Sequence, residues 1–313
     1  MTIRAIFLSL CLFSVLLQAY SQETNDGDRP LKAPRGFRSE AFLKVAYAMG
    51  FLDLIETEPA VPSSVEVKND IEYKQVDNTS LKLDIYKLKN LDEAAPLLIF
   101  IHGGGWSKGE RSDYLPYLID YAKKGYVTAT VSYRLSGTAH FPAAVEDVQC
   151  AVRWIRAHSK EYMINPNRIA LIGGSAGGHL SMMVAYADEK TDSRVQAVVN
   201  LYGPTDLTTE YARNRGECEK FLGKTYQEAP HLYKAASPRT YISPDDPPTL
   251  IFHGTIDALV PVSQSDSLHI WLDQAGVPNE YHKLKGWPHT MDVSKKVNDY
   301  CQHYMDAFFE KYL

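Results

Sequence analysis

Arg168-Ile169-Ala170-Leu171-Ile172-Gly173-Gly174-Ser175-Ala176-Gly177-Gly178-His179-Leu180 is the stretch that decides the fold. An apolar run typical of a buried strand passes through a glycine-flanked serine into a segment typical of a helix start. A strand, a sharp turn and a helix, with Ser175 at the apex, form the context that a G-x-S-x-G nucleophile elbow requires. Small residues are needed on both sides because the backbone at such a serine is strained. A glycine-rich turn with an incidental serine is the alternative, so the surroundings must decide.

A glycine run upstream of Ser175 is a candidate for a second element of a hydrolase site. His102-Gly103-Gly104-Gly105-Trp106 directly follows a buried strand pattern at residues 96–101. Consecutive glycines leave backbone N–H groups unshielded, so they can donate to the oxygen that becomes negative when an ester carbonyl is attacked. Gly103 and Gly104, together with Ala176 just after the nucleophile, are the predicted oxyanion hole. A phosphate-binding loop of the Walker type would need Gly-Lys-Ser/Thr, which is absent.

An aspartate and a histidine follow later strand patterns. Asp257 comes after residues 248–254, and His289 comes after the strand-like residues 280–284. The chain order of Ser175, Asp257 and His289 is that of the α/β-hydrolases and differs from that of chymotrypsin or subtilisin. A serine hydroxyl is a weak nucleophile until an imidazole takes its proton, and the imidazole needs a carboxylate to fix its tautomer. These three residues are the predicted catalytic triad.

Other acids and histidines lie nearby and must be weighed. His282 lies inside a strand pattern, and His303 lies on a predicted terminal helix. Asp245 and Asp246 precede their strand, which is the wrong end of the sheet, because sites lie at the carboxyl ends of strands. Asp292 follows His289 and is more typical of a helix cap.

The chain resembles the α/β-hydrolase superfamily on these motifs. More narrowly, it resembles carboxylesterases with an H-G-G-G oxyanion loop: the hormone-sensitive-lipase-like esterases and the secreted acetyl-xylan and feruloyl esterases of polysaccharide-degrading bacteria. The resemblance spans about residues 70–313 and is carried by His102 to Trp106, Ser132-Tyr133-Arg134-Leu135, Asp147-Val148, Arg153-Trp154-Ile155, Gly173 to His179, Tyr202-Gly203-Pro204, Asp206-Leu207 and Ala236-Ser237-Pro238. It implies an eight-stranded sheet and a serine esterase activity, and it says little about the acyl group or the alcohol.

Strand-like and helical runs alternate along the rest of the chain. Strands are predicted at residues 97–101, 127–133, 169–172, 197–202, 249–252 and 280–284, and helices at 114–123, 143–158, 178–186, 263–275 and 292–312. This alternation predicts an α/β fold in which a mostly parallel sheet carries helices on both faces. The alternating segments 71–75 and 81–86 predict an antiparallel hairpin at the sheet edge. The catalytic domain is predicted to cover residues 66–313.

Residues 206–246 break this alternation. They are polar and rich in Tyr, Lys, Glu and Pro, which favours a short cap-like insertion over a plain long loop. Glu217 and Glu219 within it could contact substrate, although solvated surface charge is the simpler interpretation. Trp106, which closes the oxyanion loop, either packs against an acyl or sugar group or fills the core beside the loop. It is the one predicted substrate-binding residue.

The N-terminus has the pattern of a secretory signal. Arg4 precedes mostly apolar residues 5–17, and Ala19-Tyr20-Ser21 supplies small residues before a cleavage site. A signal peptide is therefore predicted at residues 1–21, with cleavage near Ser21-Gln22 and a secreted or periplasmic mature protein. The apolar run is too short for a stable span of the roughly 30 Å hydrocarbon core. Residues 22–65 are predicted to be an N-terminal extension whose helical patch, at 41–54, either packs on the domain or covers the site.

Composition narrows the class of partner. Apolar residues make up 45% of the 313 residues, which is ample for a core, and the formal net charge of −5 gives no reason to expect nucleic acid or an anionic membrane. Cleavage of the signal leaves Cys150, Cys218 and Cys301, which permit at most one disulfide. No cysteine has zinc-site spacing, so neither a metal nor a cofactor is expected. The oligomeric state stays open.

These observations predict a secreted serine carboxylesterase. The expected substrates are short acyl esters, either small molecules or acetyl and feruloyl groups linked to plant polysaccharide. A lipolytic esterase and a formamidase or amidase on the same scaffold remain as alternatives. A peptidase related to prolyl oligopeptidase is less favoured, because the roughly 50 mature residues upstream cannot form its propeller. A non-catalytic binding protein is disfavoured by the intact Ser175, Asp257 and His289.

Overall fold

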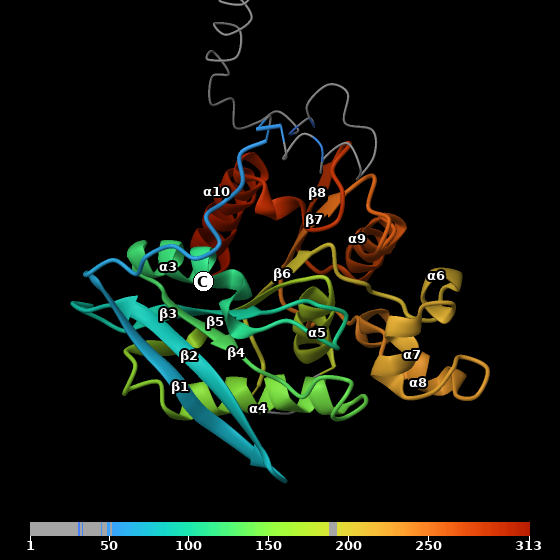
Figure 1. The fold of residues 1–313 in the computed structure, drawn as a ribbon, viewed down its shortest axis with the longest axis horizontal. Helices are drawn as coiled ribbons and strands as arrows, with labels where there is room; N and C mark the ends of the chain where they lie inside the picture. The colour runs from blue at the N-terminus through green and yellow to red at the C-terminus, as the bar shows by residue number, and fades with distance from the viewer. Residues whose placement is uncertain (1–30, 32, 34–44, 46–48, 51, 188–192) are drawn as a thin grey trace, which may run out of the picture. The chain divides into compact units, whose positions relative to one another are not determined.

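A computed structural model describes residues 31, 33, 45, 49, 50, 52–187 and 193–313 (Figure 1). The predicted signal peptide at residues 1–21 lies outside the described residues. Most of the predicted extension at 22–65 and of its helical patch at 41–54 also lies outside them. The described residues from 33 onward belong to one compact unit, and the elements below are all part of it.

One eight-stranded sheet forms the centre of this unit, in the order β1-β2-β4-β3-β5-β6-β7-β8. The strands are β1 (Val65–Val76), β2 (Thr79–Leu88), β3 (Ala95–Ile101), β4 (Val127–Val131), β5 (Ile164–Gly174), β6 (Ala197–Leu201), β7 (Thr249–Gly254) and β8 (Asn279–Leu284). Strand β2 runs antiparallel to both of its neighbours, and the remaining neighbours pair in parallel. The predicted mostly parallel sheet with an antiparallel hairpin at its edge is confirmed.

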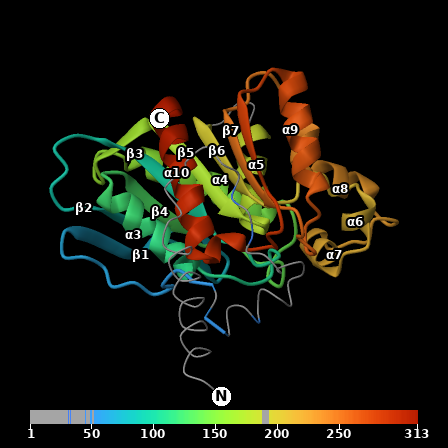
Figure 2. The ribbon, with the colours of Figure 1, turned by 90° about the horizontal axis from the view of Figure 1, so that it is seen from above.

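The helices cover both faces of the sheet. They are α3 (Leu115–Lys123), α4 (Ala143–Ala157), α5 (Ala176–Tyr186), α6 (Glu210–Arg213), α7 (Gly216–Leu222), α8 (Pro230–Ala235), α9 (Ser263–Ala275) and α10 (Lys295–Tyr312), with 3-10 turns η1 (Arg111–Tyr114), η2 (Pro238–Tyr241) and η3 (Met291–Val293). Helices α3 and α10 lie together on one face, where the Lys124 ammonium binds the Asp306 carboxylate at 2.8 Å. Helices α4 and α5 lie on the opposite face (Figure 2).

Burial along the strands follows their place in the sheet. The central strand β3 is an almost continuous apolar run with nearly every side chain buried, as a parallel strand covered on both faces requires. The edge strand β8 is polar and mostly half-exposed. The apolar core therefore follows the centre of the sheet, and loops that leave the carboxyl ends of β3, β5, β7 and β8 emerge along one edge.

Some boundaries differ from the sequence prediction. Strand β5 begins at Ile164, five residues earlier than predicted, because backbone pairing with β3 continues past a register shift and through a polar stretch. Helix α10 begins at Lys295 and not at residue 292. Ser294, with extended backbone angles, occupies its N-cap position, and the three residues before it form η3. The prediction of Asp292 as a helix cap is therefore wrong.

Residues 206–246, here called the cap, contain α6, α7, α8 and η2. Within the cap, Arg239 donates to the buried Asp206 carboxylate at 2.6 Å. The same guanidinium lies 4.5 Å from the ring centroid of Trp271 in α9, and this contact joins the cap to the body. Cys150, Cys218 and Cys301 are all free thiols. Over the part of the chain that the structure describes, no helix has both the length and the apolar character that a membrane crossing needs.

Candidate active site

Ser175 lies on a sharp turn between β5 and α5. Strand β5 ends at Gly174, and α5 begins at Ala176, so the serine is the single connecting residue. Its backbone angles, φ 56° and ψ −122°, are strained for any residue other than glycine. Neighbouring glycines allow this close packing, because a Cβ atom on Gly177 would lie only 1.9 Å from the carbonyl oxygen of Ile101. The turn has the geometry expected of a nucleophile elbow.

Asp257 and His289 meet at the ends of β7 and β8. The His289 Nδ1–H donates to Asp257 Oδ2 at 2.6 Å. The other carboxylate oxygen accepts from the backbone N–H groups of Leu259 and Val260, each at 2.8 Å. A carboxylate on Nδ1 fixes the tautomer, so Nε2 carries the lone pair that could accept a proton from a serine.

A second histidine contacts the same acid. His253, which is fully buried at the end of β7, has its Nε2 3.2 Å from Asp257 Oδ2. Burial of Asp257 opposes its ionisation, but hydrogen bonds from His253 and His289 outweigh this effect and hold its pKa well below the usual range. Asp257 is therefore a carboxylate at any pH at which the protein would act. In the sequence, His253 is one more residue inside a strand pattern, and no local signal marks it as a partner of Asp257.

The rival acids and histidines have other partners. Asp292 is buried, and its carboxylate accepts a hydrogen bond from the Tyr202 hydroxyl. Asp246 closes a turn by accepting from the backbone N–H of Ser243 at 2.9 Å, before β7 begins. His282 bonds to Glu280 and Tyr300 on the edge strand. The structure thus joins His289 to Asp257 and to none of these rival acids.

The predicted oxyanion donors lie against the nucleophile. A Cβ atom on Gly103 would lie 2.9 Å from the carbonyl oxygen of Gly174 and 3.5 Å from the Cβ of Ser175. Gly104 has φ +93°, and a side chain there would meet the backbone of Lys108 at 2.2 Å. Ala176 is the first residue of α5, so its N–H has no acceptor within the helix. Glycine is therefore required at both loop positions.

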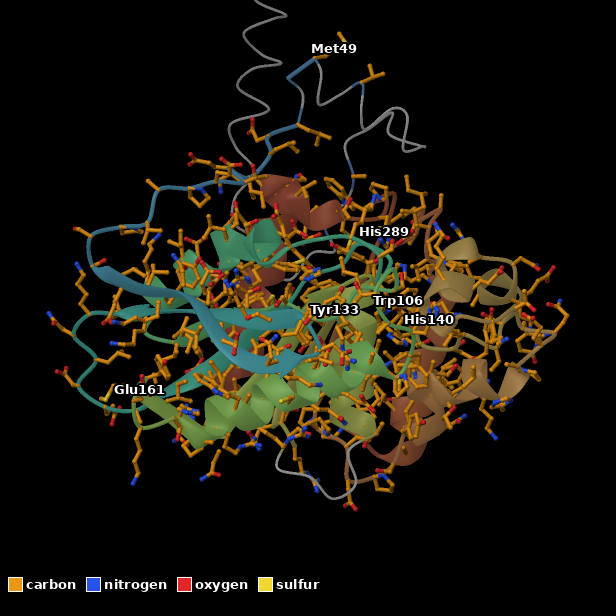
Figure 3. The ribbon with its side chains drawn as sticks, turned by 60° about the horizontal axis from the view of Figure 1, so that its bottom comes forward. Met49, Trp106, Tyr133, His140, Glu161 and His289 are labelled. Atoms are coloured by element: carbon orange, nitrogen blue, oxygen red, sulfur yellow. The ribbon has the colours of Figure 1, made fainter. Side chains whose placement is uncertain are left out.

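Trp106 links the oxyanion loop, residues 102–108, to the cap. Its side chain is only 3% exposed and stacks on Phe221 of α7, with ring centroids 4.5 Å apart. The indole N–H donates to His179 Nδ1 at 3.2 Å. Trp106 and His289, both labelled in Figure 3, line the same cavity. Trp106 therefore fills the core beside the loop, and it also lines the cavity where an acyl or sugar group could contact it.

A cavity of about 1020 Å³ joins these parts. It is lined by the oxyanion loop (103–108), the turn at 174–176, the histidine loop (289, 290, 292 and 293) and the cap (211, 215–218 and 220), together with residues 113, 114, 202, 204, 259 and 260. Its mouth carries charges of both signs, including Lys108, Arg215 and Glu217. Glu217 is exposed, as expected of surface charge, and it also borders the cavity.

Two tyrosines form a polar wall behind the serine. The ring of Tyr202 meets that of His289 edge to face, with centroids 4.6 Å apart. A Cβ atom on Gly174 would lie 2.5 Å from the Tyr114 hydroxyl and 2.9 Å from that of Tyr202. Burial raises the pKa of Asp292, which faces this wall. The signal that could have found Tyr202 is its place at the carboxyl end of β6, between the strands of the nucleophile and the acid.

The described end of the N-terminal extension touches the rim of this cavity. The Ile55 N–H donates to the carbonyl oxygen of Val293 at 3.0 Å, and the Lys295 N–H donates to that of Asp53 at 2.8 Å. Leu54 forms an antiparallel bridge with Ser294 between these two bonds. This short pairing holds residues 53–55 beside the histidine loop.

Comparisons with known proteins agree with this geometry. A family model described as BD-FAE matches residues 83–272, which include Ser175 and Asp257. Esterase LipQ of Mycobacterium tuberculosis is 32% identical over 287 residues, which cover 84% of this chain. The match covers 66% of LipQ, so the chain spans slightly less than two thirds of the length of that curated relative.

The solved structures that are similar to this chain include esterases. A truncated carbohydrate esterase from gut microbiota matches with a TM-score of 0.70 and 26% identity, over 81% of this chain and 98% of that one. The native esterase Est2 of Thermogutta terrifontis matches with a TM-score of 0.67 and 27% identity, over 82% of this chain and 95% of that one. Both proteins are described as esterases.

Proposed function

Because the chain belongs to the BD-FAE family and has the α/β-hydrolase fold, we propose that it is a serine carboxylesterase. The observation that carries this proposal is the strained Ser175 in one cavity with a histidine whose Nδ1 is bound to a buried carboxylate. This arrangement can convert a hydroxyl into a nucleophile and stabilise the histidine when it becomes charged. The esterase names of the relatives support the same activity.

The proposed reaction has two steps through an acyl-enzyme. Ser175 Oγ bonds to the ester carbonyl carbon while His289 Nε2 takes its proton, and the carbonyl oxygen becomes an oxyanion facing Gly103, Gly104 and Ala176. Collapse breaks the bond to the alcohol oxygen, which leaves with the proton from His289. Water then attacks the acyl carbon with His289 again as base, and the acid and the free serine are released.

Short acyl groups on polar alcohols are the substrates that we propose. The wall behind the serine carries the Tyr114 and Tyr202 hydroxyls and the Asp292 carboxyl, polar groups beside which a short acyl group loses less than a long apolar chain does. The charged mouth and the polar cap suit hydroxyl-rich alcohols such as sugars. The carbohydrate esterase among the similar structures supports a carbohydrate as the alcohol. We propose acetyl or feruloyl groups on plant polysaccharide as the natural esters.

A panel of esters tests the substrate class. We expect kcat/KM on p-nitrophenyl esters to fall by about tenfold or more from acetate to octanoate, because a longer acyl chain is pressed against the polar wall behind the serine. Acetylated xylan or methyl ferulate should release free acid in the same assay. A kcat/KM that rises towards octanoate, without acid release from xylan, would indicate a lipolytic esterase. Preference for N-formyl or amide substrates would indicate an amidase.

We also propose that the mature enzyme is secreted or periplasmic, from the signal pattern at residues 1–21. Intact-mass measurement of the protein from the cell envelope and the medium tests this proposal. We expect a chain that begins near Gln22. A full-length chain confined to the cytoplasm would contradict it.

A further inference from the structure

Tyr133 lies behind the oxyanion loop, and the proposed mechanism does not use it. It follows β4, which pairs in parallel with β3, so the loops after the two strands leave the sheet side by side. The side chain is 3% exposed. Its ring stacks on the imidazole of His102, with centroids 4.3 Å apart and planes inclined by 15°. Figure 3 shows Tyr133 and Trp106 in this region, and the backbone N–H of Ser136 donates to the Trp106 carbonyl oxygen at 2.8 Å.

The Tyr133 hydroxyl contacts two successive carbonyl groups of the loop. Its single hydrogen is shared between the carbonyl oxygens of His102, at 3.0 Å, and Gly103, at 3.2 Å. The first carbonyl belongs to the peptide unit whose N–H is that of Gly103, and the second to the unit whose N–H is that of Gly104. One phenol therefore binds the rear of both peptide units that are the predicted oxyanion donors.

Such a contact has two physical effects on a peptide unit. It fixes the rotation of the peptide plane, which matters here because glycines have the most conformational freedom to lose. It also polarises the unit, since hydrogen bonds in series strengthen one another and the N–H becomes a better donor. An oxyanion hole depends on both effects, because its donors must point at the developing charge before the reaction begins.

The surroundings of Tyr133 keep this hydroxyl protonated and in place. Burial raises the pKa of the Tyr133 phenol well above its usual range, so the donating hydrogen is always present. His102 Nδ1 lies 3.1 Å from the Gly103 carbonyl oxygen and supports the same peptide. The Tyr133 loop is held by Arg134, whose guanidinium binds the fully buried Asp147 carboxylate through two contacts of 2.8 Å.

We propose that Tyr133 is a positioning residue of the oxyanion hole, because its hydroxyl orients and polarises the two peptide units that hold the oxyanion. The inference rests on the proposed function, since it takes Gly103 and Gly104 as donors to an ester oxyanion. Tyr133 acts through the loop and does not touch the substrate. Its loss should therefore affect the transition state more than the bound substrate.

Tyr133→Phe tests this role, and Tyr73→Phe is its matched control. Tyr73 is also buried, and its hydroxyl donates to a backbone carbonyl, that of Ser132, at 2.6 Å. Both variants lose one buried hydroxyl that donates to a backbone carbonyl. The Tyr73 hydroxyl contacts the loop that carries Tyr133, and only the Tyr133 hydroxyl binds the oxyanion peptides. We expect Tyr133→Phe to lower kcat by about tenfold with KM within about twofold, a fraction of the loss caused by removing a whole oxyanion donor. Tyr73→Phe should keep kcat within about twofold.

A tetrahedral inhibitor separates positioning from a general loss of structure. A trifluoromethyl ketone bonds to Ser175 Oγ at its carbonyl carbon, the serine proton passes to His289, and the resulting oxyanion occupies the oxyanion hole. We expect Tyr133→Phe to weaken its inhibition constant by the same factor as kcat/KM, because both report the transition state. Equal inhibition constants in the two Phe variants would overturn the proposal.

Two unnatural residues of similar volume at position 133 test the same role if Tyr133→Phe does not fold. The residue 4-aminophenylalanine at position 133 keeps an N–H donor, whereas 4-methylphenylalanine keeps the volume without a donor. We expect the amino form to retain most of the wild-type kcat and the methyl form to lose as much as Phe. Equal kcat values for the two forms would refute the role of Tyr133 and would leave the proposed esterase function untouched. A wild-type protein without ester hydrolysis would refute the proposed function itself.

Discussion

Ser175→Ala is expected to lower kcat for ester hydrolysis by about a thousandfold or more, while leaving the thermal unfolding midpoint close to that of the wild type. The reason is that no acyl-enzyme can form without the Ser175 hydroxyl, so only binding and the oxyanion hole remain to catalyse direct attack by water. The Ser175 side chain makes no capping hydrogen bond to α5, so its replacement by alanine removes no such support of the helix. Initial rates on p-nitrophenyl acetate and a thermal melt of both proteins are the measurements.

Covalent labelling provides the control for this prediction. A fluorophosphonate should modify Ser175 in the wild type and leave the Ser175→Ala variant unlabelled. Ser181→Ala is the matched change, because Ser181 lies on the helix that begins at the elbow and its hydroxyl donates only to the Gly177 carbonyl oxygen, at 2.9 Å. We expect this variant to keep labelling and turnover. A label on another serine would contradict the assignment of the nucleophile.

The parts of the site that follow from local sequence were predictable. Residues 169–172 before Ser175 are a continuous apolar run. The glycines around Ser175 are explained by close contacts that leave no room for a side chain, such as that of Gly177 in α5 with Ile101. The same holds for Asp257 and His289, which each follow a strand and so lie at the carboxyl edge of the sheet. Strand type, turn chemistry and chain order were enough to place them.

What escaped prediction depends on which strands become neighbours. Tyr133 reaches the oxyanion loop because β4 lies beside β3, and the sequence order alone does not give that pairing. Asp292 has a helix-cap pattern in sequence, but its carboxylate accepts a hydrogen bond from Tyr202, which directly follows β6 and lies 90 residues away in the chain. The boundary of β5 was missed for a related reason, because pairing with β3 extends a strand through polar residues. In each case a long-range contact overrides the structure that the local sequence favours.

Asp257→Asn is the second change for which we expect a very large effect, a fall in kcat of about 10⁴-fold at neutral pH. An asparagine can present its amide N–H₂ to His289 Nδ1, which would leave the proton on Nε2, where it cannot accept the serine hydrogen. The carboxylate also has three other donors, from His253, Leu259 and Val260, so an uncharged group cannot satisfy the site as well. KM should change far less than kcat, because Asp257 acts on the histidine and not on the substrate.

Asp292→Asn is the matched control for Asp257→Asn. Asp292 also lines the cavity, but its carboxylate is bound to the Tyr202 hydroxyl and not to the His289 ring. We expect its replacement by asparagine to change kcat by less than about tenfold, as the loss of one buried charge-assisted hydrogen bond would. The two variants differ from the wild type by the same atoms, so the ratio of their kcat values isolates the contact with His289. Near-normal turnover in Asp257→Asn together with a large loss in Asp292→Asn would move the acid of the triad to Asp292.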